Sequence, residues 1–497
     1  MILLALALAA AQGGTGNGPI VRSDDGPVRG QSLAEGGAVF RGIRFAAPPV
    51  GPLRWRPPER PARRTSPAEA IAPHASCPQP VYGDWNRDAA AHGAEDCLFL
   101  DVRTPDLHPR AKLPVLVWIH GGGNRAGSGG GTVESRITDQ GIVLVSVQYR
   151  LGALGFLSHP ALSREQGGHS GNYGLLDQQA ALQWIQRNIA AFGGDPRRVT
   201  IAGESAGAQD VALHQLARGS RGLFAQAIQE SGTAGFGVAP RTLAQNERLG
   251  TMIATTAGGG VDAGASNLRA LPLDRILAAQ EQVDVPDLDD DSFIWLQAVV
   301  DGRVLDDTPA HLMDTGRVNA VPLIVGVNAK ELTLHGGLPT ARSIVRREFG
   351  ANASRAFNMY GLEPGGTPVA DPRLGDVTLQ LANDLTFRCP TIATSKAVTR
   401  AGAPVWQYQF DYAPPGGTVS HASEVRYVFD TPVPGVPPLQ DYWAKFVKTG
   451  NPNGGDRTLP HWAPYTVAAK DYLAFEQTGP AARRDLRGDV CRLRDVP

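Results

Sequence analysis

The segment best suited to covalent chemistry is Gly203-Glu204-Ser205-Ala206-Gly207, a G-x-S-x-G pattern. A serine hydroxyl becomes an accessible nucleophile when a sharp turn between a strand and a helix lifts it above the end of a sheet. Glycines suit such a turn because side chains there would collide with neighbouring backbone. The helix that follows would also direct its positive end at negative charge developing beside the serine. The pattern therefore predicts Ser205 as the nucleophile of an acyl-transfer reaction.

A second glycine-rich segment, His120-Gly121-Gly122-Gly123, directly follows an apolar run. Acyl transfer needs hydrogen-bond donors for the oxyanion of its tetrahedral intermediate, and glycine backbones offer unhindered N–H groups. We expect the N–H groups of Gly122, Gly123 and Ala206 to form this oxyanion hole. The alternative is a flexible loop, which the further glycines nearby would favour, but the pairing with the serine motif favours the oxyanion hole.

The acid of a serine hydrolase with this turn follows the serine in sequence and precedes the histidine. Glu331 comes just after the apolar run 321–327, a predicted strand. In open sheets of parallel strands, active-site groups lie at the carboxyl ends of the strands. We therefore expect Glu331 to be the acid.

Three histidines follow this acid in the sequence: His335, His421 and His461. His335 lies too close to the acid in sequence, and His461 lies in a proline-flanked turn. His421 follows a Pro/Gly loop and precedes residues 425–429, which we predict to be a strand, so it can reach over the sheet edge. His421 is thus the expected general base, and because the base must be neutral, turnover should fall on acidification through pH ~6.5.

The elements around these motifs alternate between strands and helices. Continuous apolar runs predict buried strands, and apolar positions at 3.6-residue spacing predict helices. The expected strands are 113–119, 142–149, 199–202 and 321–327, and the expected helices are 177–189 and 208–216. Alternation of this kind predicts a mostly parallel central sheet with helices on both faces. Together with the order of the motifs, it predicts an α/β-hydrolase fold, and we take residues 13–497 as a single domain.

Composition excludes several other classes of protein. The chain has 497 residues, 42% of them hydrophobic and 19% charged, as in folded proteins. Its 47 Lys and Arg balance 48 Asp and Glu, so no net positive field favours nucleic acid. No Cys/His spacing typical of a metal site is present, and the chemistry above requires no metal or organic cofactor. We expect a small-molecule ester substrate, no nucleic acid partner and no membrane span; the oligomeric state is left open.

The first residues are compatible with export. Residues 1–11 are apolar and end in small residues, as in a signal peptide, although they lack a basic start and are too short to span a bilayer; we expect residues 1–12 to be a signal peptide. The alternative is an apolar chain terminus. Four cysteines, an even number, are compatible with two disulfides in an oxidising compartment, or with buried thiols in a cytosolic protein. We expect a secreted or periplasmic protein.

Longer segments of the chain resemble the type B carboxylesterase family, which includes bacterial carboxylesterases and cholinesterases. The similarity extends over nearly everything after residue 12. The matching blocks are residues 40–51, the segment Glu95-Asp96-Cys97-Leu98-Phe99-Leu100, and residues 171–207 up to the serine motif. The resemblance also assigns the family's acid to Glu331 and its histidine to His421. It implies carboxylic ester hydrolysis through a Ser-His-Glu triad and an acyl-enzyme intermediate.

The resemblance further implies pairings outside the triad. They are a Cys77–Cys97 disulfide, by position a second from Cys389 to Cys491, a structural Arg54–Glu95 pair, and support of the triad by Glu204 and Glu424. Where the family often has an aromatic after the glycine run, this chain has Asn124, so we expect a more polar acyl-side pocket. The family's usual Asp-Glu-Gly at the acid is Lys330-Glu331-Leu332, which changes the turn. Competing functions are a non-catalytic cholinesterase-like binding protein, an amidase or a lipase.

Overall fold

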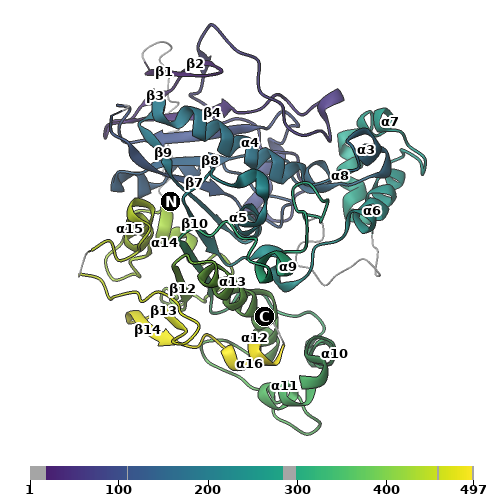
Figure 1. Cartoon of the computed structure of the whole chain (residues 1–497), viewed down its shortest axis with the longest axis vertical. Helices are drawn as coiled ribbons and strands as arrows, with labels where there is room; N and C mark the ends of the chain where they lie inside the picture. The colour runs from purple at the N-terminus through teal and green to yellow at the C-terminus, as the bar shows by residue number, and fades with distance from the viewer. Residues whose placement is uncertain (1–17, 109, 284–297, 456–457, 495–497) are drawn as a thin grey trace, which may run out of the picture.

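The computed structural model describes residues 18–108, 110–283, 298–455 and 458–494 (Figure 1). The predicted signal segment, residues 1–12, lies outside the described residues. In the part of the chain that is described, no helix is both long and apolar enough to cross a membrane.

Among the described residues, eleven strands form one sheet that runs through the middle of the molecule. In spatial order they are β14 (Gly479–Arg484), β13 (Asp471–Glu476), β12 (Val405–Phe410), β11 (Leu323–Asn328), β10 (Gln226–Glu230), β9 (Gly194–Glu204), β7 (Leu113–Ile119), β8 (Val143–Val147), β6 (Phe99–Thr104), β4 (Ala38–Arg44) and β3 (Gln31–Ser32). In this spatial order, the strands from β13 through β7 to β8 are parallel to one another, and the strands at both edges of the sheet are antiparallel to their neighbours. A separate small sheet contains β1 (Ile20–Ser23), β2 (Gly26–Arg29) and β5 (Ala68–Glu69). The predicted mostly parallel sheet of an α/β-hydrolase fold is confirmed.

Helices cover both faces of this sheet. They are α1 (Arg87–Ala91), α2 (Gly152–Phe156), α3 (Pro160–Glu165), α4 (Tyr173–Asn188), α5 (Ala206–Leu216), α6 (Leu243–Thr256), α7 (Ala265–Arg269), α8 (Leu273–Gln282), α9 (Pro309–Asp314), α10 (Gly337–Phe349), α11 (Ala353–Tyr360), α12 (Val377–Asn383), α13 (Cys389–Arg400), α14 (Val425–Phe429), α15 (Leu439–Thr449) and α16 (Gly488–Leu493). Helices α3, α6, α7 and α8 gather on one side of the molecule, and α10, α11 and α16 gather at the end where the C-terminus lies (Figure 1).

The continuous apolar runs of the strands reflect burial on both faces. In β7, Val115 and Val117 pack with the cluster that includes α4, whereas Leu116 and Trp118 pack with the cluster that includes α15. Alternate residues of a strand point to opposite faces, so a strand covered on both faces needs apolar residues at every position. Each such side chain contributes ~1.5–3 kcal/mol to stability on burial.

The prediction that residues 425–429 form a strand is wrong, because Val425–Phe429 is the short helix α14. Its Val428 and Phe429 are buried, and Phe429 packs edge-on against Trp118 with ring centroids 4.7 Å apart. A short apolar run is compatible with either a strand or a buried helix, and here the helical turn is what brings these two residues to the sheet. Other boundaries shift as well, most of all those of α4, which begins before residue 177, and of β9, which begins at Gly194 rather than at residue 199.

Two disulfides join the cysteines in the pairs that the resemblance implied. One links Cys77 to Cys97 and the other links Cys389 to Cys491. The implied structural pair is also present, since Arg54 Nε donates to Glu95 Oε2 at 2.6 Å. The second disulfide ties the start of α13 to α16, near the segments that carry the functional residues described next.

Candidate active site

Ser205 lies in the sharp turn between β9 and α5 and has backbone angles of φ 57° and ψ −124°, with φ in the positive region that glycine favours. The glycines on either side are needed for close packing. A Cβ at Gly203 would lie 2.5 Å from the backbone of Gly207, and a Cβ at Gly207 would lie 2.1 Å from the carbonyl oxygen of Ile119. The strained conformation persists because the surrounding backbone leaves no room for another, which is typical of functional turns.

The side chain of Ser205 is the first member of a hydrogen-bonded chain of three residues. Its Oγ lies 2.8 Å from Nε2 of His421, and Nδ1 of His421 lies 2.7 Å from Oε2 of Glu331. With the proton on Nδ1, the imidazole donates to the carboxylate and accepts from the serine hydroxyl. The three residues follow the carboxyl ends of β9, β11 and β12. The parallel sheet therefore brings Ser205 and His421 together although they are 216 positions apart in sequence. The alternatives His335 and His461 are both exposed and belong to neither bond.

The carboxylate of Glu331 is held from the side opposite His421. Its Oε1 accepts a hydrogen bond from Ser231 Oγ at 2.7 Å and from the backbone N–H of Asn328 at 2.6 Å. The turn after the acid is fixed by a bond of 3.0 Å from the Leu332 N–H to Asn383 Oδ1. Oε1 therefore already has two donors, and Oε2 is the oxygen that faces the imidazole.

Sequence reasoning missed Ser231 and Asn328, although both lie where parallel strands end. Asn328 is the last residue of β11 and Ser231 directly follows β10. Their side chains also reach Glu424, whose Oε1 lies 3.1 Å from Ser231 Oγ and whose Oε2 accepts from Asn328 Nδ2 at 2.7 Å. The signal that could have found them is a polar residue at the carboxyl end of the strand that leads to the acid, or of the strand next to it.

Several buried carboxyl groups set the electrostatics around His421. Glu204 Oε1 lies 3.2 Å from its Nε2; burial raises the pKa of Glu204, and the positive charge of His421 opposes this rise. Burial lowers the pKa of His421, but the negative charge of Glu204 and the charge and hydrogen bond of Glu331 outweigh it, and this pKa rises to about 9. Burial and the charge of Glu331 raise the pKa of Glu424. The imidazolium is therefore more stable here than in water.

These pKa shifts change the expected pH dependence. A base with a raised pKa becomes neutral only at higher pH, so activity should fall on acidification above pH ~6.5 rather than through it. Replacing Glu204 with glutamine removes a negative charge that stabilises the imidazolium. We expect the acidic limb of kcat/KM in Glu204→Gln to move to lower pH by roughly one to three units. The exposed Glu59→Gln should leave the limb in place, and an unchanged limb in Glu204→Gln would contradict this account.

The predicted oxyanion loop, residues 121–123, lies directly against the nucleophile. A Cβ at Gly121 would lie 2.6 Å from the carbonyl oxygen of Glu204 and 3.1 Å from Cβ of Ser205, so only glycine allows this approach. Gly122 and Gly123 have φ angles of 100° and 67°, and a Cβ built at Gly123 would meet no atom within 4 Å. The loop is thus open on the side of Gly123, while Ala206 begins the helix on the other side of Ser205.

The expectation that Asn124 makes the acyl-side pocket more polar is wrong. Asn124 is completely buried, and its side chain is directed into the protein, where Nδ2 donates to Asp210 at 3.1 Å. Its backbone has a φ of 54°, a left-handed conformation that asparagine tolerates better than most residues. The polar side chain therefore holds the loop from behind and does not contact substrate space.

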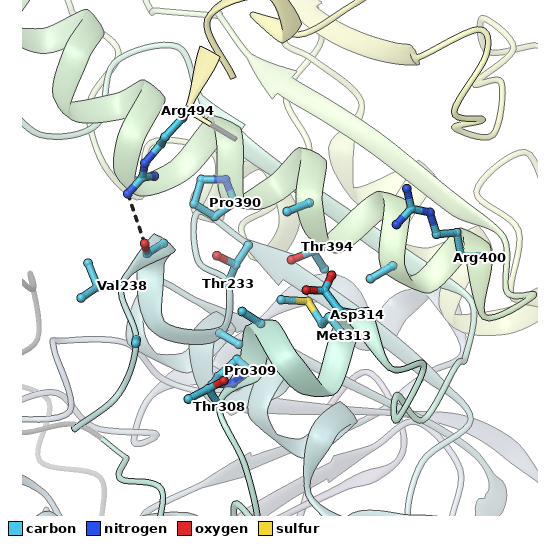
Figure 2. A pocket seen from close by; sticks show the side chains of 16 residues that line it. Thr233, Val238, Thr308, Pro309, Met313, Asp314, Pro390, Thr394, Arg400 and Arg494 are labelled. Atoms are coloured by element: carbon cyan, nitrogen blue, oxygen red, sulfur yellow. Dashed lines mark hydrogen bonds between the residues drawn. The ribbon is translucent and has the colours of Figure 1, made fainter. Parts of the chain in front are cut away.

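An apolar pocket of about 270 Å³ lies between α13, α9 and the turn after β10 (Figure 2). Pro390 and Thr394 of α13 face Pro309 and Met313 of α9 across it. None of the three hydrogen-bonded residues Ser205, Glu331 and His421 lines this pocket. It is therefore separate from the site described above.

Comparisons with known proteins show which family the chain belongs to. The model of the Carboxylesterase family matches residues 17–493. The chain belongs to the carboxylesterase family. Carboxylesterase relatives include a liver carboxylesterase of Sus scrofa, 34% identical with 98% of this chain and 95% of the relative covered, and liver carboxylesterase 1F of Rattus norvegicus, 32% identical with 97% and 95% covered. A solved structure titled PNB esterase is 28% identical, with a TM-score of 0.80 over 96% of this carboxylesterase and 100% of that chain. This enzyme is therefore a carboxylic ester hydrolase with an α/β-hydrolase fold.

Proposed function

We propose that the enzyme cleaves carboxylic esters through an acyl-enzyme intermediate on Ser205, with His421 as general base and Glu331 as the acid. The observation that carries this proposal is the hydrogen-bonded chain from Ser205 Oγ to His421 Nε2 and from His421 Nδ1 to Glu331 Oε2. Nucleophile, base and orienting acid in series are the arrangement that acyl transfer needs. A complete chain of this kind also argues against a non-catalytic binding protein.

Hydrolysis then proceeds in two steps. His421 removes the proton of Ser205 as Oγ attacks the ester carbonyl, and the N–H groups of Gly122, Gly123 and Ala206 stabilise the oxyanion. His421 gives the proton to the leaving alcohol, and the acyl group stays on Ser205. Water, deprotonated by the same imidazole, releases the carboxylic acid. The triad itself does not distinguish esters from amides, so the preference for esters rests on family membership.

A fluorophosphonate probe tests the nucleophile directly. We expect the probe to inactivate the enzyme and to add its mass to the peptide that contains Ser205, because an activated serine attacks phosphorus as it attacks a carbonyl. Peptide mass spectrometry locates the adduct, and Ser205→Ala serves as the control with the fold retained. Labelling that persists in Ser205→Ala would show that another residue is the nucleophile.

We also propose that the protein is exported to the periplasm or secreted. The apolar residues 1–11 support this, and so do the two disulfides, which persist mainly in oxidising compartments. Cell fractionation with an antibody should find the mature protein outside the cytoplasm, with no free thiol on Cys77 or Cys97. Protein recovered only from the cytoplasm with reduced cysteines would refute the proposal.

A further inference from the structure

We propose that Asn124 and Asp210 are positioning residues that hold the two halves of the oxyanion hole at the correct separation. The inference rests on the proposed function, because it concerns how the donors for the oxyanion are placed. Asn124 directly follows the glycine loop that carries two of these donors. Asp210 lies on α5, the helix whose first residue, Ala206, carries the third.

The side chain of Asn124 joins the loop to its surroundings by both of its polar atoms. Nδ2 donates to Asp210 Oδ1 at 3.1 Å, and Oδ1 accepts from the hydroxyl of Tyr149 at 3.1 Å. The one hydrogen of this hydroxyl is shared with the carbonyl oxygen of His120, which lies 2.7 Å from the tyrosine oxygen. The residues before and after the three glycines are therefore fixed to one tyrosine, and the left-handed turn between them has little freedom to move.

Asp210 is held from the opposite side by α4. Its Oδ2 accepts from Gln178 Nε2 at 2.6 Å, and Gln178 Oε1 lies 2.8 Å from Nε2 of His214, one turn further along α5. All three side chains are 1% exposed or less. Within the described ranges, no lysine or arginine lies close enough to Asp210 to lower its pKa, which burial raises to about 7. A buried carboxylate with no cation is costly and serves no evident purpose for stability alone.

The hydrogen bond between residues 124 and 210 needs a donor at one of the two positions and an acceptor at the other. Asp210 receives one N–H group from Asn124 and one from Gln178, so an amide in its place would direct an NH2 group at another NH2 group. An apolar residue at position 124 would leave Asp210 Oδ1 without its donor and would remove one of the two acceptors of the Tyr149 hydroxyl. Exchanging the two residues, however, restores every bond: the amide now at position 210 donates to the carboxylate now at position 124, which still accepts from Tyr149.

This symmetry defines the experiment. Three variants are compared with the wild type: Asp210→Asn, Asn124→Leu, and the exchanged double variant Asn124→Asp with Asp210→Asn. We expect each single substitution to lower kcat by about 10- to 100-fold with little change in KM, because a small misplacement of oxyanion donors affects mainly the transition state. The exchanged variant should recover to within about threefold of the wild type by restoring the donor and the acceptor.

A trifluoromethyl ketone inhibitor separates this role from a general loss of stability. Its adduct with Ser205 carries an oxyanion, so its affinity should fall with kcat in the single variants and return in the exchanged one. The matched control is Asn246→Ala, since Asn246 is also buried and its Nδ2 donates to Phe156 and Ser158 away from the site. This variant should lower the melting temperature and leave kcat and inhibitor affinity unchanged.

Each outcome of the comparison decides the inference. Wild-type kcat and inhibitor affinity in a folded Asp210→Asn and Asn124→Leu would overturn it, and so would an exchanged variant that folds but stays as slow as the singles. If the single variants do not fold, the exchanged variant alone decides the inference, by whether its kcat and its inhibitor affinity return to near the wild-type values. A wild-type enzyme that the ketone does not inhibit would instead refute the proposed function, since no serine adduct would form.

Discussion

Replacing His421 with alanine is expected to lower kcat by about 10⁶-fold, the scale known for removing the serine or the histidine of a triad. The variant loses the imidazole nitrogen that takes the serine proton, because His421 Nε2 lies 2.8 Å from Ser205 Oγ. Steady-state hydrolysis of a nitrophenyl ester measures the effect, and circular dichroism verifies the fold.

Two other histidines provide matched controls for this substitution. His335 and His461 are exposed, so His335→Ala and His461→Ala should keep kcat within about twofold of the wild type, as is usual for changes at surface positions. Wild-type turnover in His421→Ala, with turnover lost in either folded control, would show that the proposed triad has the wrong histidine.

Replacing Glu331 with glutamine is expected to lower kcat by about 10⁴-fold, as an Asp to Asn change does in serine proteases. The hydrogen bonds of Glu331 determine how the amide would be placed. Oε1 already accepts from Ser231 and from the N–H of Asn328, so the NH2 group of glutamine must take the place of Oε2 and face His421. Nδ1 then has to accept a hydrogen bond, which puts the proton on Nε2, and the imidazole can no longer accept from Ser205.

The pH profile and Glu331→Asp distinguish this tautomer effect from misfolding. Aspartate keeps the acceptor but is shorter, so Glu331→Asp should retain more activity than Glu331→Gln at the same melting temperature. Wild-type activity in Glu331→Gln would mean that Glu331 does not determine which tautomer His421 adopts.

The parts of the fold that the sequence predicted are those where local pattern and tertiary environment agree. The run 113–119 corresponds to β7 at both ends, because a strand covered on both faces is apolar throughout. Residues 425–429 are also rich in β-branched and aromatic residues, yet they form α14. Five residues are too few for periodicity to separate a strand from a buried helix, and the contact with Trp118 that selects the helix is invisible in sequence.

The candidate active site, like the fold, was predictable from the sequence only in part. The serine motif selected Ser205 and the predicted strand before Glu331 selected the acid. The order serine, acid, histidine still left three histidines, and the loop before His421 favoured it over the other two. The direction of the Asn124 side chain was not predictable, since it depends on Asp210, which is 86 residues away in sequence. The raised pKa of His421 likewise depends on buried carboxylates that only the folded chain brings together.

The bond between Cys389 and Cys491 closes a covalent ring that contains His421 and five of the elements that follow α13. Residues 414–418, within this ring, are exposed in the loop that leads to His421. A protease that cuts the chain there leaves Cys389 on one piece and Cys491 on the other, so the pieces remain one molecule. The serine and the histidine of this enzyme thus stay covalently connected after cleavage of the peptide chain between them.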